Sequence, residues 1–287
     1  MNEKSHLNHL LLLTVATLFI STSGALGKFI DMPTPVIIWW RSALAAIFLF
    51  IFCIYKGIDL KINNGKDRWT FFLAALLMGA HWITYFYALK LSNVAIGMLS
   101  IFTFPVMIAL LEPLFSKTKL DPIHIVLGFI VLIGVYILAP DFDLESSQLQ
   151  GILFGLISAL CYALRILILK GHVAQYNGTM LMFYQVAIIA VILAPVLYFM
   201  DTSNMTTQYP YVILLALMTT AIGHTMFVNS LKYFKASTAS IIGSAQPIFG
   251  IIIAFIFLKE IPTIHTFVGG TLILATVVIE SIRSKKN

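Results

Sequence analysis

Long apolar runs follow one another along the whole chain and constrain its fold more than any other feature. A helix needs about 20 mostly apolar residues to cross the hydrocarbon core of a bilayer. Cutting the chain at its polar and turn residues gives ten segments of about that length. The predicted spans are residues 8–27, 34–55, 69–89, 93–115, 122–139, 150–169, 178–199, 209–231, 237–258 and 263–282. We therefore predict an all-α integral membrane protein with ten transmembrane helices.

Composition excludes an ordinary soluble domain. The 287 residues are 60% hydrophobic and 10% charged, whereas soluble domains are roughly half apolar and a quarter charged. Cys53 and Cys161 both lie in apolar stretches, so neither a metal-ligand spacing nor a disulfide framework is present. We expect no metal and no cofactor. The net charge of +6 comes from bases in short loops, a pattern typical of membrane topology rather than of nucleic-acid binding.

The loop charges predict the orientation. If the N-terminus is cytoplasmic, thirteen Lys and Arg residues fall in inside segments and three, Lys28, Lys90 and Lys259, fall in outside segments. Cytoplasmic loops of membrane proteins carry the excess of Lys and Arg. Both termini are therefore expected in the cytoplasm.

The chain contains an internal repeat with an offset of 142 residues. Leu89-Lys90 is followed sixteen residues later by Pro105, and Leu231-Lys232 is followed sixteen residues later by Pro247. The same offset relates Phe115 to Phe257, Gly128 to Gly270 and Lys28 to Lys170. Self-similarity at a fixed period indicates a duplicated unit.

Each unit contains five spans, so we predict two repeats, residues 1–145 and 146–287, within one membrane domain. An odd number of spans forces the second repeat into the membrane from the opposite side. Lys28, predicted outside, and Lys170, predicted inside, show this inversion. Inverted repeats are characteristic of secondary transporters, in which the substrate lies near mid-membrane and rocking exposes it to alternate sides.

The order and spacing of several motifs resemble the drug/metabolite transporters, specifically the EamA-type carriers with ten helices. The motifs are Trp39-Trp40-Arg41-Ser42-Ala43; Ala88-Leu89-Lys90 with Ala95, Pro105 and Pro113; and Ser230-Leu231-Lys232 through Ala239, Pro247 and Lys259-Glu260. The resemblance covers nearly the whole chain. It implies an inner (plasma) membrane carrier of amino acids, nucleobases, vitamins or organic phosphates, often an exporter. It also implies that Arg41 has a structural or gating role.

Arg165 is the leading candidate for substrate binding. It lies in span six about five residues from Lys170, and a guanidinium at that depth must face protein, water or a ligand. It either lines a central cavity or snorkels to the cytoplasmic headgroups. At the 142-residue offset its counterpart is Ser23, so the scaffold does not demand the charge. This asymmetry favours a ligand role, and Tyr162 of the same span is included in the predicted site.

Two histidines stand at nearly equivalent places in the repeats. His81 in span three and His224 in span eight come one position apart after alignment. Such residues serve either as hydrogen-bonding partners between helices or as lining of the central pathway. Tyr85 shares a helix face with His81 and Trp82 offers an aromatic wall, so both join the predicted substrate site.

In span nine, Ser244 and Pro247 share one stripe, with Gln246 beside them. A stripe of small residues indicates close helix packing or, with a proline, a kink that frees a backbone carbonyl. Pro105 is expected to act likewise in span four. The predicted site therefore has Ser244 and Gln246 as substrate-binding residues, and Pro105, Pro247 and Arg41 as gating or kink residues.

The carboxylates Glu112 and Glu280 come near the ends of spans four and ten, where we expect them at the membrane interface. No carboxylate is then left near mid-membrane, the position that proton-coupled carriers commonly use. Facilitated diffusion, exchange or histidine-linked proton coupling is therefore expected.

The predicted function is secondary transport of a small polar metabolite by alternating access, with an amino acid or derivative favoured and export or exchange expected. Nucleobase, vitamin and organic-anion carriers are alternatives. The sequence contains none of the HExxH, GxSxG or paired-aspartate patterns of membrane enzymes. The rival classes are a channel and a receptor or scaffold that moves no substrate. The expected partners are the metabolite and the bilayer, not nucleic acid, with a monomer favoured over a dimer.

Overall fold

The computed structural model describes residues 3–116, 119–138, 143–172, 175–230 and 242–283, and all regular structure within them is helical. The first half contains α1 (Glu3–Phe29), α2 (Thr34–Lys56), α3 (Gly65–Leu91), α4 (Val94–Ile101), α5 (Phe104–Ser116) and α6 (Pro122–Leu138). The second half contains α7 (Ser147–Leu169), α8 (Gly178–Leu193), α9 (Val196–Phe199), α10 (Met205–Leu214), η1 (Leu215–His224), α11 (Thr225–Ser230), α13 (Ala245–Leu258) and α14 (Ile264–Arg283). Leu231, Lys232 and Ala239 of the second-half motif lie outside the described residues.

The helices are those of a protein that crosses a membrane many times. Within the described residues, eight helical segments are long and apolar enough to span a bilayer. In three of these segments consecutive helices follow each other: α4 with α5, α8 with α9, and α10 with η1 and α11. The helices α6 and α13 are apolar but shorter. These segments follow the order of the ten predicted spans, and the prediction of an all-α membrane fold is confirmed.

Two of the predicted spans are interrupted just before a proline. Span four breaks at Phe102 and Thr103, so that Pro105 lies in the first turn of α5. A bend at Ser244 precedes α13, and Pro247 lies in its first turn. First-turn amides have no partner within the helix, so a proline there removes no helical hydrogen bond. Each proline thus starts a new helix rather than bending a continuous one.

Span eight differs from the plain helix expected. Its central ten residues, Leu215–His224, form a π-helix between α10 and α11. Most π-helical segments are single-turn bulges and many lie at functional sites. Wider winding changes which side chains share a face, so the sequence alignment of His224 with its counterpart in the first repeat does not fix its direction.

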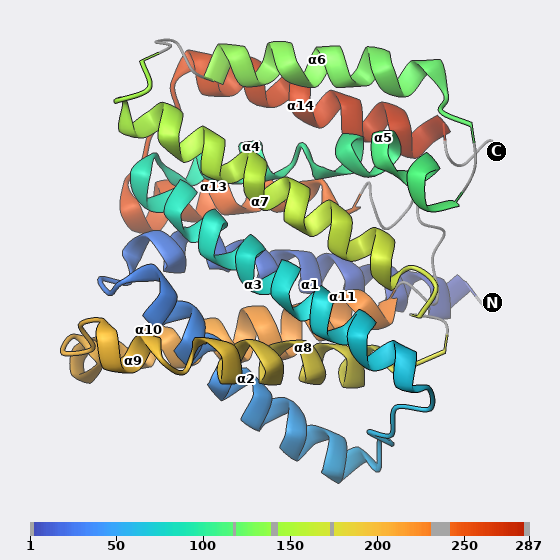
Figure 1. The fold of residues 1–287 in the computed structure, drawn as a ribbon. Coiled ribbons are helices and arrows are strands. Elements are labelled where there is room, and N and C mark those ends of the chain that lie inside the picture. The colour runs from blue at the N-terminus through green and yellow to red at the C-terminus, as the bar shows by residue number, and fades with distance from the viewer. Residues whose placement is uncertain (1–2, 117–118, 139–142, 173–174, 231–241, 284–287) are drawn as a thin grey trace.

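Equivalent helices of the two halves make equivalent packing contacts. The helix α3 packs on α7, and η1, the corresponding part of the second half, packs on α1. In the same way α4 and α5 pack on α7, and α13 packs on α1. The helix pairs α2 with α8 and α6 with α14 join equivalent helices of the two halves. Figure 1 shows α6 and α14 side by side at one edge of the molecule and α2 at the opposite edge.

Glycines allow α6 and α14 to touch through their backbones. A Cβ placed on Gly269 would lie 2.6 Å from the carbonyl oxygen of Gly134, and one on Gly134 would lie 3.0 Å from that of Gly269. Without a hydrophobic drive between helices in lipid, such close approach supplies the van der Waals contact that holds them together.

Hydrogen bonds close the face of the bundle at the C-terminal end of α3. Lys28 Nζ donates to the carbonyl oxygens of Lys90 and Ser92 at 3.1 and 2.7 Å, where α3 has unpaired terminal carbonyls. Glu260 accepts a 2.8 Å hydrogen bond from the amide of Val94 at the start of α4. A carboxylate is favourable at a helix N-terminus and a cation at a C-terminus. We refer to these contacts of Lys28 and Glu260 as the closed-face contacts.

Candidate functional site

A cavity of about 570 Å³ runs from the centre of the bundle toward the face opposite the closed-face contacts. Ten of the eleven residues predicted for the site line it: Arg41, His81, Trp82, Tyr85, Pro105, Tyr162, Arg165, His224, Ser244 and Gln246. Pro247 is not among its lining residues and is buried in α13. Residues predicted at equivalent depths of separate spans thus gather around one space, although this placement does not test their roles.

Arg165 faces the cavity and does not extend to the membrane surface. Its side chain is 7% exposed, and Nε donates a 2.6 Å hydrogen bond to Oε1 of Gln185 on α8. One Nη lies 3.7 Å from the sulfur of Met182, and Cζ lies 5.6 Å from the ring centroid of Tyr162. All these partners are uncharged. Of the two positions expected for this arginine, cavity lining or snorkelling, the structure shows the first.

Arg41 is a second buried guanidinium on the same cavity. It is 1% exposed, with Cζ 4.0 Å from the ring centroid of Trp82. Nε donates a 2.7 Å hydrogen bond to Oγ1 of Thr220, which η1 provides. An arginine over a tryptophan face is stabilised by the ring quadrupole, and more so away from water. Nη1 is buried and has no hydrogen-bond partner within the described parts of the chain.

His81 is held in a defined tautomer by α7. The hydroxyl of Ser158 donates to the carbonyl oxygen of His81 at 2.7 Å, so its one hydrogen is used. Nδ1 lies 2.9 Å from that hydroxyl and 3.2 Å from the carbonyl oxygen of Ser158, and must therefore be the donor. Nε2 is left as the acceptor of the ring. Tyr162 and Tyr85 lie 4.7 and 6.3 Å away between ring centroids.

His224 approaches from the other half. Its ring centroid lies 6.0 Å from that of Trp82, so residues of α3 contact both the histidine of η1 and the tyrosine of α7. Arg41 and Arg165 both lie within electrostatic range of His81 and of His224. Two guanidiniums, two imidazoles and three aromatic rings thus surround the deep part of the cavity.

Acidic groups stand at the mouth of the cavity and not in its depth. Within the described parts of the chain, the acidic residues that line it are Glu112 and Glu280. Glu112 forms an ion pair with Lys170. Glu280 lies 3.2 Å from Nε2 of His124 and 3.2 Å from a guanidinium nitrogen of Arg283. The two carboxylates were expected at the interface; they also face the entrance.

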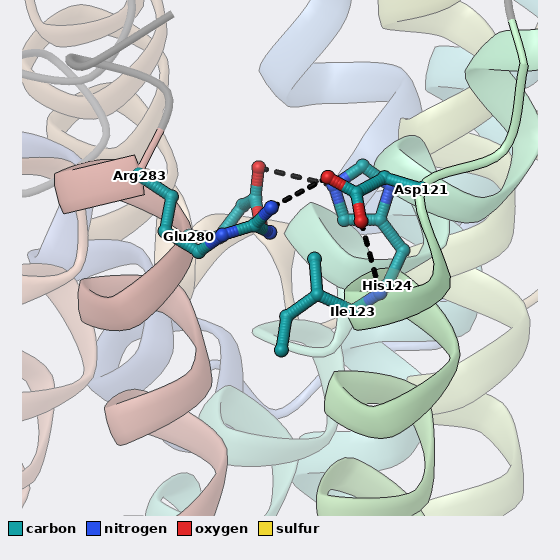
Figure 2. Close-up of polar contacts among 5 residues, drawn as sticks. All are labelled: Asp121, Ile123, His124, Glu280 and Arg283. Carbon is teal, nitrogen blue, oxygen red and sulfur yellow. Dashed lines mark hydrogen bonds and ion pairs between the residues drawn. The ribbon is translucent and has the colours of Figure 1, made fainter.

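Figure 2 shows the charged group where α6 begins and α14 ends. Arg283 joins Glu280 to Asp121, whose Oδ2 lies 2.5 Å from Nη2 of the arginine. Asp121 also accepts from the amide of Ile123 at 3.0 Å. The hydrogen bond from Ile123 and the guanidinium of Arg283 hold the pKa of Asp121 below its ordinary value of 3.8. This ion-pair group ties together the paired helices α6 and α14 beside the entrance.

Sequence reasoning missed Gln185, Thr220, Ser158 and Met182. Gln185 carried a usable signal, because an amide inside an apolar span has to find a polar partner. The threonine and serine gave no comparable signal, since their hydroxyls commonly bond to the preceding turn of their own helix. Thr220 reaches Arg41 from the π-helical turn, which the sequence pattern does not reveal.

Within the described residues, eight long and two shorter apolar helical segments surround a deep cavity that contains buried polar side chains. This arrangement defines a polytopic membrane protein with an internal site for a small ligand. The EamA-like transporter family matches the chain twice, over residues 7–139 and 149–282. The chain belongs to this family and is a membrane transporter. The two matches agree with the duplication seen in the sequence, and the expected resemblance to EamA-type carriers is confirmed.

Relatives span nearly the whole chain at low identity. It is 22% identical over 280 residues to the pseudopaline exporter CntI of Pseudomonas aeruginosa, covering 96% of each protein. It is 21% identical over 279 residues to the uncharacterized transporter YxxF of Bacillus subtilis, covering 94% of this chain and 88% of the relative. A crystal structure with 15% identity superposes with a TM-score of 0.69, covering 97% of this chain and 98% of the other, which shows a shared fold.

Proposed function

We propose that this protein carries a small polar metabolite with an anionic group across the cell membrane by alternating access, and that Arg165 binds the anion. The observation that carries the proposal is the buried guanidinium of Arg165 on a ligand-sized cavity. Its bonding partners among the described residues are all neutral. An unpaired charge at that depth is costly. A substrate carboxylate offers the charge and the two-pronged geometry that a guanidinium matches.

The surroundings favour an amino acid or a derivative of one. Nε2 of His81 accepts a hydrogen bond from a donor such as an ammonium or hydroxyl group, while the rings of Tyr162, Phe102 and Phe104 offer an apolar wall. Nucleobases, vitamins and other organic anions are the alternatives. The pseudopaline exporter CntI, at 22% identity, supports export as the direction.

The proposed orientation puts both termini in the cytoplasm, on the strength of thirteen bases against three in the loops. The cavity mouth carries Lys170, which this topology puts inside. The described conformation is then open to the cytoplasm, with the closed-face contacts on the outside. Labelling of an Arg68→Cys variant by an impermeant maleimide, in a background with Cys53 and Cys161 replaced by alanine, is expected only after the cells are opened.

Flux into proteoliposomes tests the proposed function. A radiolabelled amino-acid mixture, and separately a monocarboxylate such as butyrate, are offered to vesicles with the wild-type protein and with Arg165→Gln. Saturable uptake with acceleration by the same compound on the far side is expected for the wild type. Loss of that flux is expected for the variant, with monodisperse protein retained. Unsaturable flux indicates a pore, and binding without flux indicates a receptor.

Coupling to protons is tested in the same vesicles. With Glu112 and Glu280 paired at the mouth, we propose facilitated diffusion, exchange or histidine-linked coupling. An imposed pH gradient is expected to change flux little, or to act through His81 and His224. Strong acceleration that disappears only in Glu112→Gln contradicts this. We further propose that the unit of transport is a monomer, since one chain encloses the cavity.

A further inference from the structure

Arg41 has a hydrogen-bonding capacity that the protein does not use. A guanidinium carries five N–H donors. Nε is taken by Thr220, whereas Nη1 is buried without a partner among the residues that the structure describes. Packing against Trp82 stabilises the charge through the ring face but satisfies no N–H group. A buried donor left unpaired costs about 1–3 kcal/mol. A purely structural arginine explains the contact with Trp82 and leaves Nη1 unexplained.

The two guanidiniums of the cavity have different aromatic partners beside one short stretch of α3. Arg41 rests on Trp82, and Arg165 lies beside Tyr162, whose ring packs on the adjacent His81. Each arginine comes from a different half of the protein, α2 and α7. One carboxylate held in a fork-to-fork pair occupies a single guanidinium. The arrangement therefore presents two separate positions for anions.

No internal carboxylate among the described residues balances the two charges. The acidic residues of the cavity lining, Glu112 and Glu280, are engaged at its mouth with Lys170 and with His124 and Arg283. The deep wall between the arginines is aromatic. A bound molecule that matches this cavity carries a negative charge at each of its two ends and an apolar or flat portion between them.

We propose that the cavity has two anion subsites, at Arg41 and at Arg165, and that the substrate carries two anionic groups separated by an apolar or planar segment. This inference rests on the proposed function, and it assigns Arg41 to substrate binding in place of the structural or gating role that the family resemblance implies. The chemical class of the substrate is then a dicarboxylate, including an amino-acid derivative with a second carboxylate. Thr220 and Trp82 are positioning residues that aim Arg41.

A homologous series of straight-chain α,ω-dicarboxylates tests the inference, with monocarboxylates of matched length as controls. Thermal unfolding of the detergent-purified protein is measured at one concentration of each compound, because selective binding raises the midpoint by mass action. We expect dicarboxylates to raise it more than their monocarboxylate partners. We also expect one optimal dicarboxylate length, set by the separation of the arginines. Monocarboxylates are expected to show no such optimum.

Variants assign the subsites. Arg41→Gln is expected to weaken the best dicarboxylate by at least about tenfold, toward the level of the monocarboxylate, and to weaken the monocarboxylate by much less. Arg165→Gln is expected to abolish both. Retained monocarboxylate binding also shows that Arg41→Gln is folded. If that variant does not fold, the length optimum, measured on the wild type alone, decides the matter.

Three negative results are distinguishable. Equal midpoint shifts from dicarboxylates and monocarboxylates in the wild type overturn the second subsite, while sensitivity of both to Arg165→Gln leaves the proposed anion carrier standing. An absence of any shift from either class overturns the inference together with the proposed anion site. A dicarboxylate advantage that survives Arg41→Gln shows that another group binds the second anion and also overturns the assignment.

Discussion

The guanidinium of Arg41 lies over the indole of Trp82, with Cζ 4.0 Å from the ring centroid. This contact joins α2 to α3 within the first half, and the hydrogen bond from Arg41 to Thr220 joins both to the second half. A charge buried between the halves is therefore held by the aromatic faces of Trp82 and Phe86 and by one hydroxyl. The contact serves stability and orientation together, and the two effects separate by substitution.

Trp82→Leu is expected to lower the unfolding midpoint in detergent, because it removes a fully buried ring and the cation–π contact, the latter worth about 0.5–2 kcal/mol. Trp82→Phe keeps part of that contact and is expected to lose less. Trp69, 75% exposed, provides the control, and Trp69→Leu is expected to leave the midpoint unchanged. Equal losses from Trp82→Leu and Trp69→Leu contradict this account.

Gln185→Leu removes the acceptor that orients Arg165. A lost hydrogen bond to a charged group costs about 1.5–3 kcal/mol, so we expect transport to fall about tenfold or more at limiting substrate. Gln175→Leu, at an exposed position of the loop after α7, is the matched control. Flux assays in proteoliposomes measure both. Full activity of the Gln185 variant means that the arginine needs no orienting partner.

Gly269→Ala is expected to separate α6 from α14, because its Cβ would press on the carbonyl oxygen of Gly134. Overpacking of this kind costs about 1–3 kcal/mol. The control is Gly65→Ala at the start of α3, where a Cβ meets nothing within 4 Å. Thermal unfolding compares the two variants. If Gly269→Ala is more stable than Gly65→Ala, the two helices can move apart without a loss of stability.

Lys28→Met is expected to favour the conformation that opens at the closed-face contacts. Loss of the hydrogen bonds of the ammonium to Lys90 and Ser92 is expected to shift the balance of conformations by about tenfold or more. A cysteine in place of Ser23, on the cavity wall, reports opening through its labelling rate from that face. Lys259→Met is the control. Identical labelling rates with and without the Lys28→Met substitution show that Lys28 does not hold this face closed.

Asp121→Asn tests the ion-pair group at the cavity entrance. Because the pKa of Asp121 is lowered in the folded protein, its stabilising effect is present above the ordinary value of 3.8 and is lost as the pH falls through the lower folded value. The wild type is therefore expected to exceed the variant in stability at neutral pH, with the gap closing below pH 3.8. If the difference in stability between the wild type and the variant grows on acidification, the pKa of Asp121 is not lowered in the folded protein.

The span count was predictable because bilayer thickness limits helix length, and the repeat was readable because Pro105 and Pro247 keep their spacing from the preceding Leu-Lys pairs. The gathering of His81, Arg165 and His224 followed from depth and symmetry. The sequence could not show in which direction each side chain points around its helix axis. The unpartnered Nη1 of Arg41 depends on the neighbours packed against it, and Thr220 reaches Arg41 only because η1 winds more widely than an α-helix.

The fold of the two halves is duplicated, and the two arginines of the cavity are not. At the 142-residue offset, Arg41 falls on Phe183, Arg165 on Ser23 and Gln185 on Ala43. The helices that the two halves share and the polar side chains that differ within the cavity are therefore encoded by separate sets of positions. Selection can alter what is carried by changing a few side chains, without retuning the machinery that carries it.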